Sequence, residues 1–211
     1  MIIPRYYEDL DFLHEHTMPP RAYYIPASHR MEDLVEHREA SDRVQMLNGM
    51  WKFRYFESIY DVRDAFYESG YDTSDFDEIP VPGVWQMAGY DTHQYTNIRY
   101  PFPFDPPYVP QDIPCGAYVH NFEYHREKKA SKAFLNFEGV DSCFYVWVNG
   151  TYAGYSQVPH ATSEFDVTDL LNEGENTLAV LVLKWCDGSY LEDQDKFRMS
   201  GIFRDVYLLK R

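Results

Sequence analysis

The sequence has few cysteines and no long apolar run. Its three cysteines, Cys115, Cys143 and Cys186, are odd in number and widely spaced, which argues against both a disulfide framework and a zinc site. We interpret them as buried thiols of a reducing compartment. Nowhere do about 18 apolar residues run together, and the start lacks a basic stretch followed by an apolar one. These absences predict a cytoplasmic protein with no membrane partner.

Positive charge is also scarce. There are 19 Lys and Arg against 34 Asp and Glu, which gives a formal net charge of -15. Because nucleic acids and anionic lipids are bound by neutralising their phosphates with Lys and Arg, neither is expected as a partner. A neutral sugar meets no such penalty. The 19 Tyr and 4 Trp supply flat faces that sugars can use, although most of them are expected to fill a core.

Motifs for several kinds of chemistry are missing. The sequence contains no G-x-S-x-G, P-loop or G-x-G-x-x-G, so acyl transfer, phosphate cradling and dinucleotide binding have no support. The carboxylates of a retaining glycosidase must lie about 5 Å apart on rigid elements, and acids that are neighbours within one loop are poor candidates. No catalytic residue is therefore predicted within these 211 residues.

Period-two alternation predicts an all-β fold. Trp51, Phe53 and Tyr55 share one face of a strand that begins near residue 48. Further strands are predicted over residues 78–81, 117–124, 133–138, 144–148, 152–157, 177–185 and 202–209. Asn149-Gly150 between two of them is typical of a type I′ hairpin turn. Short antiparallel strands without βαβ alternation predict a sandwich or jelly roll.

The other segments are irregular. Residues 1–45 are expected to form an arm lying across the domain or a neighbour, with a helical pattern over residues 29–37. A second short helix is predicted over residues 60–67, and Asp166 is expected to cap a single helical turn. Residues 82–116 are rich in proline and aromatics. A loop this long is normally functional or disordered, and we expect an ordered, functional one.

A second unusual segment, residues 185–208, is dense in acidic side chains. They are Asp187, Glu192, Asp193, Asp195 and Asp205. Carboxylates at this density repel one another unless water, a cation or a hydroxyl-rich ligand holds them. A solvated acidic loop and a metal or sugar site both remain open. Since no Cys or His spacing suggests zinc, the candidate cations are Na⁺, Mg²⁺ and Ca²⁺.

Six stretches of the sequence form a recognisable set. They are LNGMWKF at 47–53, VPGVWQMAGYDTHQYTNIRYPF at 81–102, VNGTYAGYSQ at 148–157, SEFDVTDLL at 163–171, GENTLAVLVLKW at 174–185 and DGSYLEDQDKFRMSGIFRDVYL at 187–208. Together they closely resemble the sugar-binding domain of large bacterial β-galactosidases of glycoside hydrolase family 2. The WQM-x-GYD-x-x-x-YTN run and DGSYLEDQD are most typical of that branch.

The resemblance implies a galactose-binding-like jelly roll over residues 46–211, followed beyond Arg211 by an immunoglobulin-like domain and a TIM barrel that carries two catalytic glutamates. It implies hydrolysis of terminal non-reducing β-D-galactose from lactose-like glycosides with retention, in a homo-oligomer. The fragment itself is expected to be inactive. Two alternatives stay open: a non-catalytic carbohydrate-binding module, and a β-glucuronidase-like enzyme on the same scaffold.

The resemblance also assigns site residues. Asn97 and Asp195 are implied to reach the barrel's active site and bind the galactosyl unit, and Asp195 also to ligate Na⁺. An amide can donate to and accept from sugar hydroxyls, and a carboxylate offers a hard oxygen to a cation. Asp187 and Gln157 are implied ligands of Mg²⁺. Tyr6 stands where the family has an aspartate in this set, so one usual Mg²⁺ ligand is missing.

Overall fold

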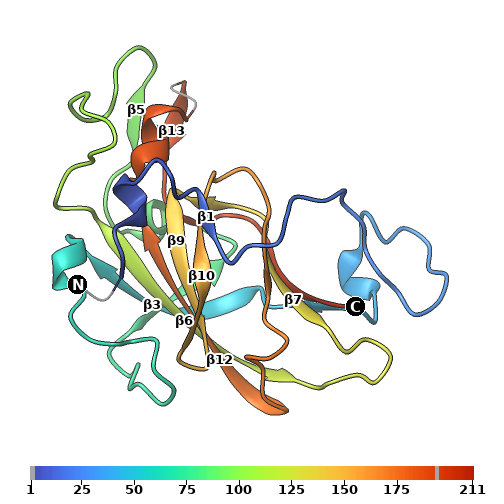
Figure 1. Cartoon of the computed structure of the whole chain (residues 1–211). Helices are drawn as coiled ribbons and strands as arrows, with labels where there is room; N and C mark the ends of the chain where they lie inside the picture. The colour runs from blue at the N-terminus through green and yellow to red at the C-terminus, as the bar shows by residue number, and fades with distance from the viewer. Residues whose placement is uncertain (1–2, 193–194) are drawn as a thin grey trace.

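Two antiparallel sheets face each other in the computed structural model, which describes residues 3–192 and 195–211 (Figure 1). The larger sheet has the strand order β1 (His14–Glu15), β10 (Thr151–Gln157), β9 (Cys143–Val148), β12 (Gly174–Leu183), β6 (Cys115–Tyr124), β3 (Gly49–Phe56) and β4 (Asp77–Val81). The smaller has the order β11 (Ser163–Asp166), β7 (Ala133–Phe137), β15 (Val206–Lys210) and β2 (Val44–Met46). Two short pairs complete the described strands, β14 (Gly201–Ile202) with β8 (Val140–Asp141), and β13 (Lys196–Arg198) with β5 (Gln94–Thr96). The predicted all-β jelly-roll sandwich is confirmed.

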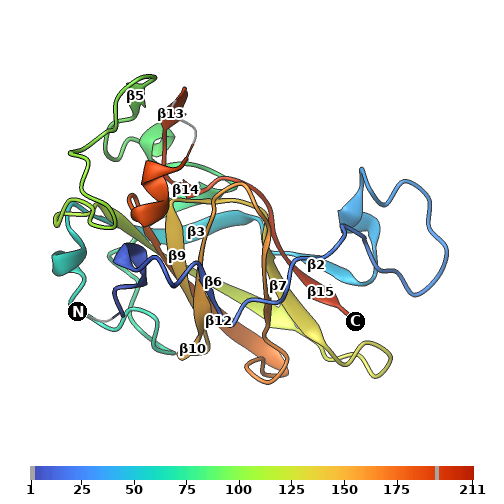
Figure 2. The same cartoon turned by 45° about the horizontal axis from the view of Figure 1, so that its top comes forward.

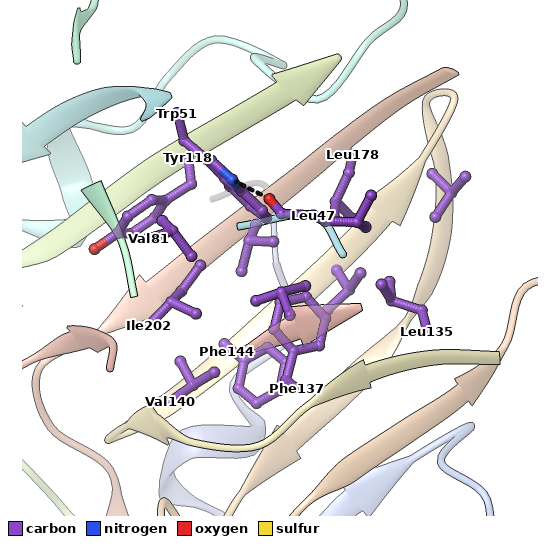
Figure 3. Close-up of a cluster of buried hydrophobic side chains, with 14 of the residues drawn as sticks. Leu47, Trp51, Val81, Tyr118, Leu135, Phe137, Val140, Phe144, Leu178 and Ile202 are labelled. Atoms are coloured by element: carbon purple, nitrogen blue, oxygen red, sulfur yellow. Dashed lines mark hydrogen bonds between the residues drawn. The ribbon is translucent and has the colours of Figure 1, made fainter. Parts of the chain in front are cut away.

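The main core lies between the two sheets (Figure 3). Trp51 on β3, Phe144 on β9 and Leu178 on β12 point into it from the larger sheet, and Leu135 and Phe137 on β7 from the smaller one. Burying each such side chain contributes roughly 1.5–3 kcal/mol. The indole Nε1 of Trp51 donates to the Leu47 carbonyl at 2.8 Å, so its one polar atom is satisfied inside the core.

The larger sheet is buried on its other face as well. Tyr145 and Tyr155 lie there, covered by Ile3 and Tyr7 from the amino-terminal arm and by aromatic side chains such as Phe66. This explains why β9 reads as six consecutive buried residues rather than an alternating strand. The arm therefore lies across the body of this domain, as the blue trace in Figure 2 shows.

The two predicted helices are wrong. Residues 29–37 form only a turn, followed by the 3-10 helix η2 (Arg38–Ala40), and Val35 in this segment is 73% exposed. Without an apolar face to bury, nine residues do not offset the cost of helix nucleation. Over residues 60–67 only the 3-10 helix η3 (Ile59–Asp61) forms. Val62 and Phe66, which are spaced as on one face of a helix, are both buried there. They are buried because an irregular segment packs on the sheet, and no helix forms.

The segment 82–116 is more regular than expected. It contains the 3-10 helix η4 (Trp85–Ala88), in which Trp85 is fully buried, and the strand β5. The predicted strand over 202–209 is instead divided between β14 and β15. The turn after Asp166 forms as predicted, with the Thr168 N–H donating to Asp166 Oδ1 at 3.1 Å.

The predicted hairpin turn at Asn149-Gly150 is confirmed, since both residues have positive φ, 51° and 79°. The Asn149 side chain also donates to the Leu170 carbonyl at 2.8 Å and accepts from the Thr177 N–H at 2.9 Å. We expect Asn149→Ala to lower the free energy of unfolding by about 2 kcal/mol, because it combines left-handed strain with lost hydrogen bonds. Equilibrium denaturation would measure this, with Asn149→Gly as the control that relieves the strain and keeps only the hydrogen-bond loss.

Candidate functional site

The two residues implied to bind sugar meet at the end of a two-stranded ribbon. Strands β5 and β13 pair antiparallel, with Lys196 opposite Thr96 and Arg198 opposite Gln94. Continuing this register by one residue places Asp195 opposite Asn97. Residues almost a hundred positions apart are thus brought together at the ribbon's tip, which projects from one end of the sandwich in both views (Figures 1 and 2).

The ribbon's tip is open to solvent. Asn97 and Asp195 are both exposed, and the Tyr95 hydroxyl donates to Asp195 Oδ1 at 2.5 Å. This hydrogen bond to a carboxylate raises the pKa of Tyr95. The Tyr95 and Phe197 rings lie 5.5 Å apart between centroids, and both are more than half exposed. The tip thus offers an amide, a carboxylate and an aromatic surface on one side only. Sequence reasoning missed Tyr95, although it lies within the YTN motif.

Buried ion pairs hold the base of the ribbon. Arg198, only 3% exposed, donates to Glu192 Oε2 at 2.9 Å, and Lys196 pairs with Asp141 at 3.2 Å. The Ser142 hydroxyl donates to the other Glu192 oxygen at 3.0 Å. Burial, reinforced by the nearby negative charge of Asp141, raises the pKa of Glu192 to about 7. These contacts fix β13, and with it Asp195, to the sandwich.

The raised pKa of Glu192 makes stability depend on pH. The ordinary pKa of a Glu side chain, which an unfolded chain would show, is 4.5. The folded state therefore binds the proton more tightly, and the stability that this proton provides is lost as pH rises from about 4.5 to 7. Relative to Glu192→Gln, the wild type should lose about 3 kcal/mol of stability between pH 4.5 and 8. Denaturation of both proteins across this range tests the difference, and parallel curves would contradict it.

The acidic segment is not a single cluster. Asp205 accepts from the Asn48 side chain at 2.9 Å and lies 3.7 Å from an Arg38 nitrogen, away from the ribbon. Asp193 lies outside the described residues. Across 3–192 and 195–211, no three His, Cys, Asp or Glu side chains gather closely enough to hold a metal by themselves.

Asp187 is a separate buried carboxylate. It is 4% exposed, and within the described chain neither of its oxygens makes a hydrogen bond. Burial is the main cause of its raised pKa, and the negative charges of Asp9 and Glu8 add to it. The Gln157 side chain and the Gly188 N–H lie close enough to Asp187 to lower its pKa in part, but neither meets the geometry of a hydrogen bond.

The two implied magnesium ligands are therefore neighbours, at the place where the arm meets the acidic segment. Helix η1 (Tyr6–Glu8) packs against η5 (Asp187–Tyr190). Tyr6 does not replace the missing carboxylate, because its hydroxyl donates to Glu15 at 3.0 Å and its ring stacks on Phe12. An unpartnered buried carboxylate near further acids fits a hard cation, which takes oxygen ligands only. The Gln157 Oε1 itself accepts from the Tyr155 hydroxyl at 2.8 Å.

The fold is a sandwich of two antiparallel sheets with a projecting two-stranded ribbon. The chain belongs to the glycosyl hydrolases family 2, whose sugar binding domain matches residues 44–211.

Similar proteins agree with this assignment. A beta-galactosidase of Actinobacillus pleuropneumoniae is 54% identical over the whole chain, and one of Staphylococcus xylosus is 47% identical. The chain spans about a fifth of the length of these curated relatives, 20% and 21%. Among solved structures, Bacteroides uniformis beta-glucuronidase 2 superimposes with a TM-score of 0.60 at 22% identity, covering 79% of this chain and 18% of that one. This last likeness shows the fold alone.

Proposed function

We propose that this chain is the domain that completes the substrate pocket of a longer β-galactosidase. The enzyme would hydrolyse terminal non-reducing β-D-galactose from lactose-like glycosides with retention, by double displacement on two glutamates of a downstream barrel. The observation that carries the proposal is the register of β5 and β13, whose continuation by one residue would set Asn97 opposite Asp195. Relatives that are named beta-galactosidases and are about five times as long support it.

In this proposal the chain's own residues bind the galactosyl unit and orient it. Asn97 hydrogen-bonds the hydroxyls of the galactosyl ring, Tyr95 holds the Asp195 carboxylate in place, and Asp195 takes sugar hydroxyls and a sodium ion. Sodium would supply a positive charge that binds sugar oxygens. Asp187 and Gln157 would hold Mg²⁺, which would neutralise the buried carboxylate where the arm meets the acidic segment.

A β-glucuronidase on the same scaffold is the first alternative. Its substrate carries a carboxylate, which Asp195 at the ribbon's tip would repel unless a cation intervened. A free-standing carbohydrate-binding module is the second. The one-sided, open tip argues against it, because a sugar needs a pocket closed on several sides. The domain alone is expected to bind galactose no tighter than about millimolar.

Purified natural enzyme, as the full chain, should be assayed on chromogenic β-galactoside and β-glucuronide with the same leaving group. Turnover of the galactoside with little of the glucuronide is expected. Turnover of the glucuronide alone would favour the first alternative, and binding without turnover the second.

We further infer that the enzyme is a cytoplasmic homo-oligomer with no nucleic-acid or membrane partner. All three cysteines are free and buried, which is usual where thiols stay reduced. No helix in the described ranges is long and apolar enough to cross a membrane. The excess of 34 acidic over 19 basic side chains disfavours nucleic acid and anionic lipid.

A further inference from the structure

We propose that the outer face of the smaller sheet carries a second ligand site, which takes a single neutral polyhydroxyl ring such as a monosaccharide. The site is a pocket of about 250 Å³ between this face and the arm that folds over it. It goes beyond the proposed function, since the ribbon bearing Asn97 and Asp195 lies at another end of the molecule (Figures 1 and 2).

The floor of the pocket follows from the strand register. Glu164 on β11 and Tyr207 on β15 both pair with Asn136 on β7, so the three side chains form a row across the sheet. Leu135 and Phe137, the neighbours of Asn136, belong to the main core. Because side chains alternate along a strand, Asn136 faces outward into the pocket that it lines.

Asn136 supplies an unused acceptor. Its side chain is fully buried, and its Nδ2 donates to the Phe134 carbonyl at 3.0 Å. Its Oδ1 has no hydrogen-bond partner within residues 3–192 and 195–211. A buried amide oxygen without a donor costs about 1–3 kcal/mol, so a hydroxyl-bearing ligand that donates to it recovers this loss.

The charges of the pocket favour a neutral occupant. The charged side chains that line the pocket are Arg21 and Glu164, which pair at 2.6 Å; Arg211, outside the lining, adds a second guanidinium to the same carboxylate at 2.5 Å, so one positive charge is left over. His14 also lines the pocket, and burial lowers its pKa, which keeps the imidazole neutral at neutral pH. The Glu164 carboxylate is thus not free to bind a cation, and titration with phosphate tests whether the excess guanidinium charge draws an anion instead; a neutral polyol needs no countercharge.

The walls suit a sugar ring in shape and size. Tyr23 from the arm, about half exposed, and Met18 are among the side chains that line the pocket. Aromatic faces pack well against the C–H surface of a sugar, while hydroxyls reach the polar floor. The pocket is smaller than the roughly 300–1,000 Å³ of sites for drug-sized ligands, so it matches one ring.

The Met18 methyl group offers a local probe. In the full natural enzyme labelled with ¹³C-methyl methionine, and with the signal assigned through Met18→Leu, titration with D-galactose and with D-glucose should shift the Met18 resonance saturably. A Kd on the order of millimolar is expected. The same shift is expected in the Asn97→Ala enzyme, because Asn97 lies on the ribbon and not in this pocket. A shift that survives this substitution is therefore independent of the ribbon and of the proposed activity. Inorganic phosphate should cause no saturable shift.

Three variants test the residues. Ala161→Trp, an exposed position of the pocket wall, should fill the site and abolish the shift. Asn136→Leu keeps the branched shape of the side chain but removes the acceptor, and should weaken sugar binding at least about tenfold. Val35→Trp, exposed and outside the pocket, should leave it unchanged. The proposal is overturned if no sugar shifts Met18, if only phosphate does, or if Ala161→Trp still responds.

Discussion

Replacing Asp195 with alanine in the full natural enzyme is expected to lower kcat/KM for a chromogenic β-galactoside about 100-fold and to abolish its response to Na⁺. The carboxylate at the ribbon's tip is the hard anionic oxygen that both the cation and the sugar would use. Removing such a charged partner costs about 2–4 kcal/mol, which corresponds to a factor of about 30 to 1,000. Steady-state rates in Na⁺ and in K⁺ alone, at equal ionic strength, measure the effect.

Asp205→Ala is the matched control for this experiment. Asp205 belongs to the same acidic segment but bonds Asn48 and lies away from the ribbon. It should keep the Na⁺ response and most of the activity. Tyr95→Phe removes only the hydroxyl that holds Asp195 and should give a smaller loss, which appears mainly in the sodium requirement. An Asp195→Ala enzyme that still responds to Na⁺ like the wild type would remove Asp195 from the site.

Arg198→Met is expected to have the largest effect on stability. It leaves Glu192 buried beside Asp141 without its ion-pair partner, and breaking a buried pair in this way costs about 3–5 kcal/mol. The loss should be greater at pH 8 than at pH 5, because Glu192 can take up a proton at the lower pH. Hydrogen exchange of the backbone around β13 should report the opening, with protection reduced about 100-fold or more at pH 8.

The double variant Glu192→Gln/Arg198→Met is the control, because it removes the uncompensated charge. It should recover part of the lost protection, and the coupling between the two sites should fade at acid pH. Additive losses that do not change with pH would contradict a buried ion pair at the base of the ribbon.

Much of the sandwich was predictable because its signals are local. The alternation of Trp51 and Phe53, the Asn149-Gly150 turn and the cap at Asp166 each depend on a few neighbouring residues. The helix predicted over 60–67 failed because apolar spacing cannot tell a helix from an irregular segment that packs on a sheet. The helix predicted over 29–37 failed because none of its residues is buried.

The placement of the candidate site was predictable in part. Asn97 and Asp195 were named from their motifs, but nothing local to 94–96 distinguishes a strand from the proline-rich loop around it. Its partner lies about a hundred residues away, and pairing at that distance depends on the fold. For the same reason, the sequence identified Asn136 only as a strand residue. That it lines a pocket depends on the arm closing over the sheet.

The most direct test of the central claim is a crystal structure of the full natural enzyme with galactose bound. The expected result is that the Asn97 amide lies within hydrogen-bonding distance of the galactosyl hydroxyls, and that the Asp195 carboxylate contacts the sugar or a cation that the sugar also binds. A galactose held by the catalytic domain alone, with the tip of the β5–β13 ribbon out of reach, would contradict the account.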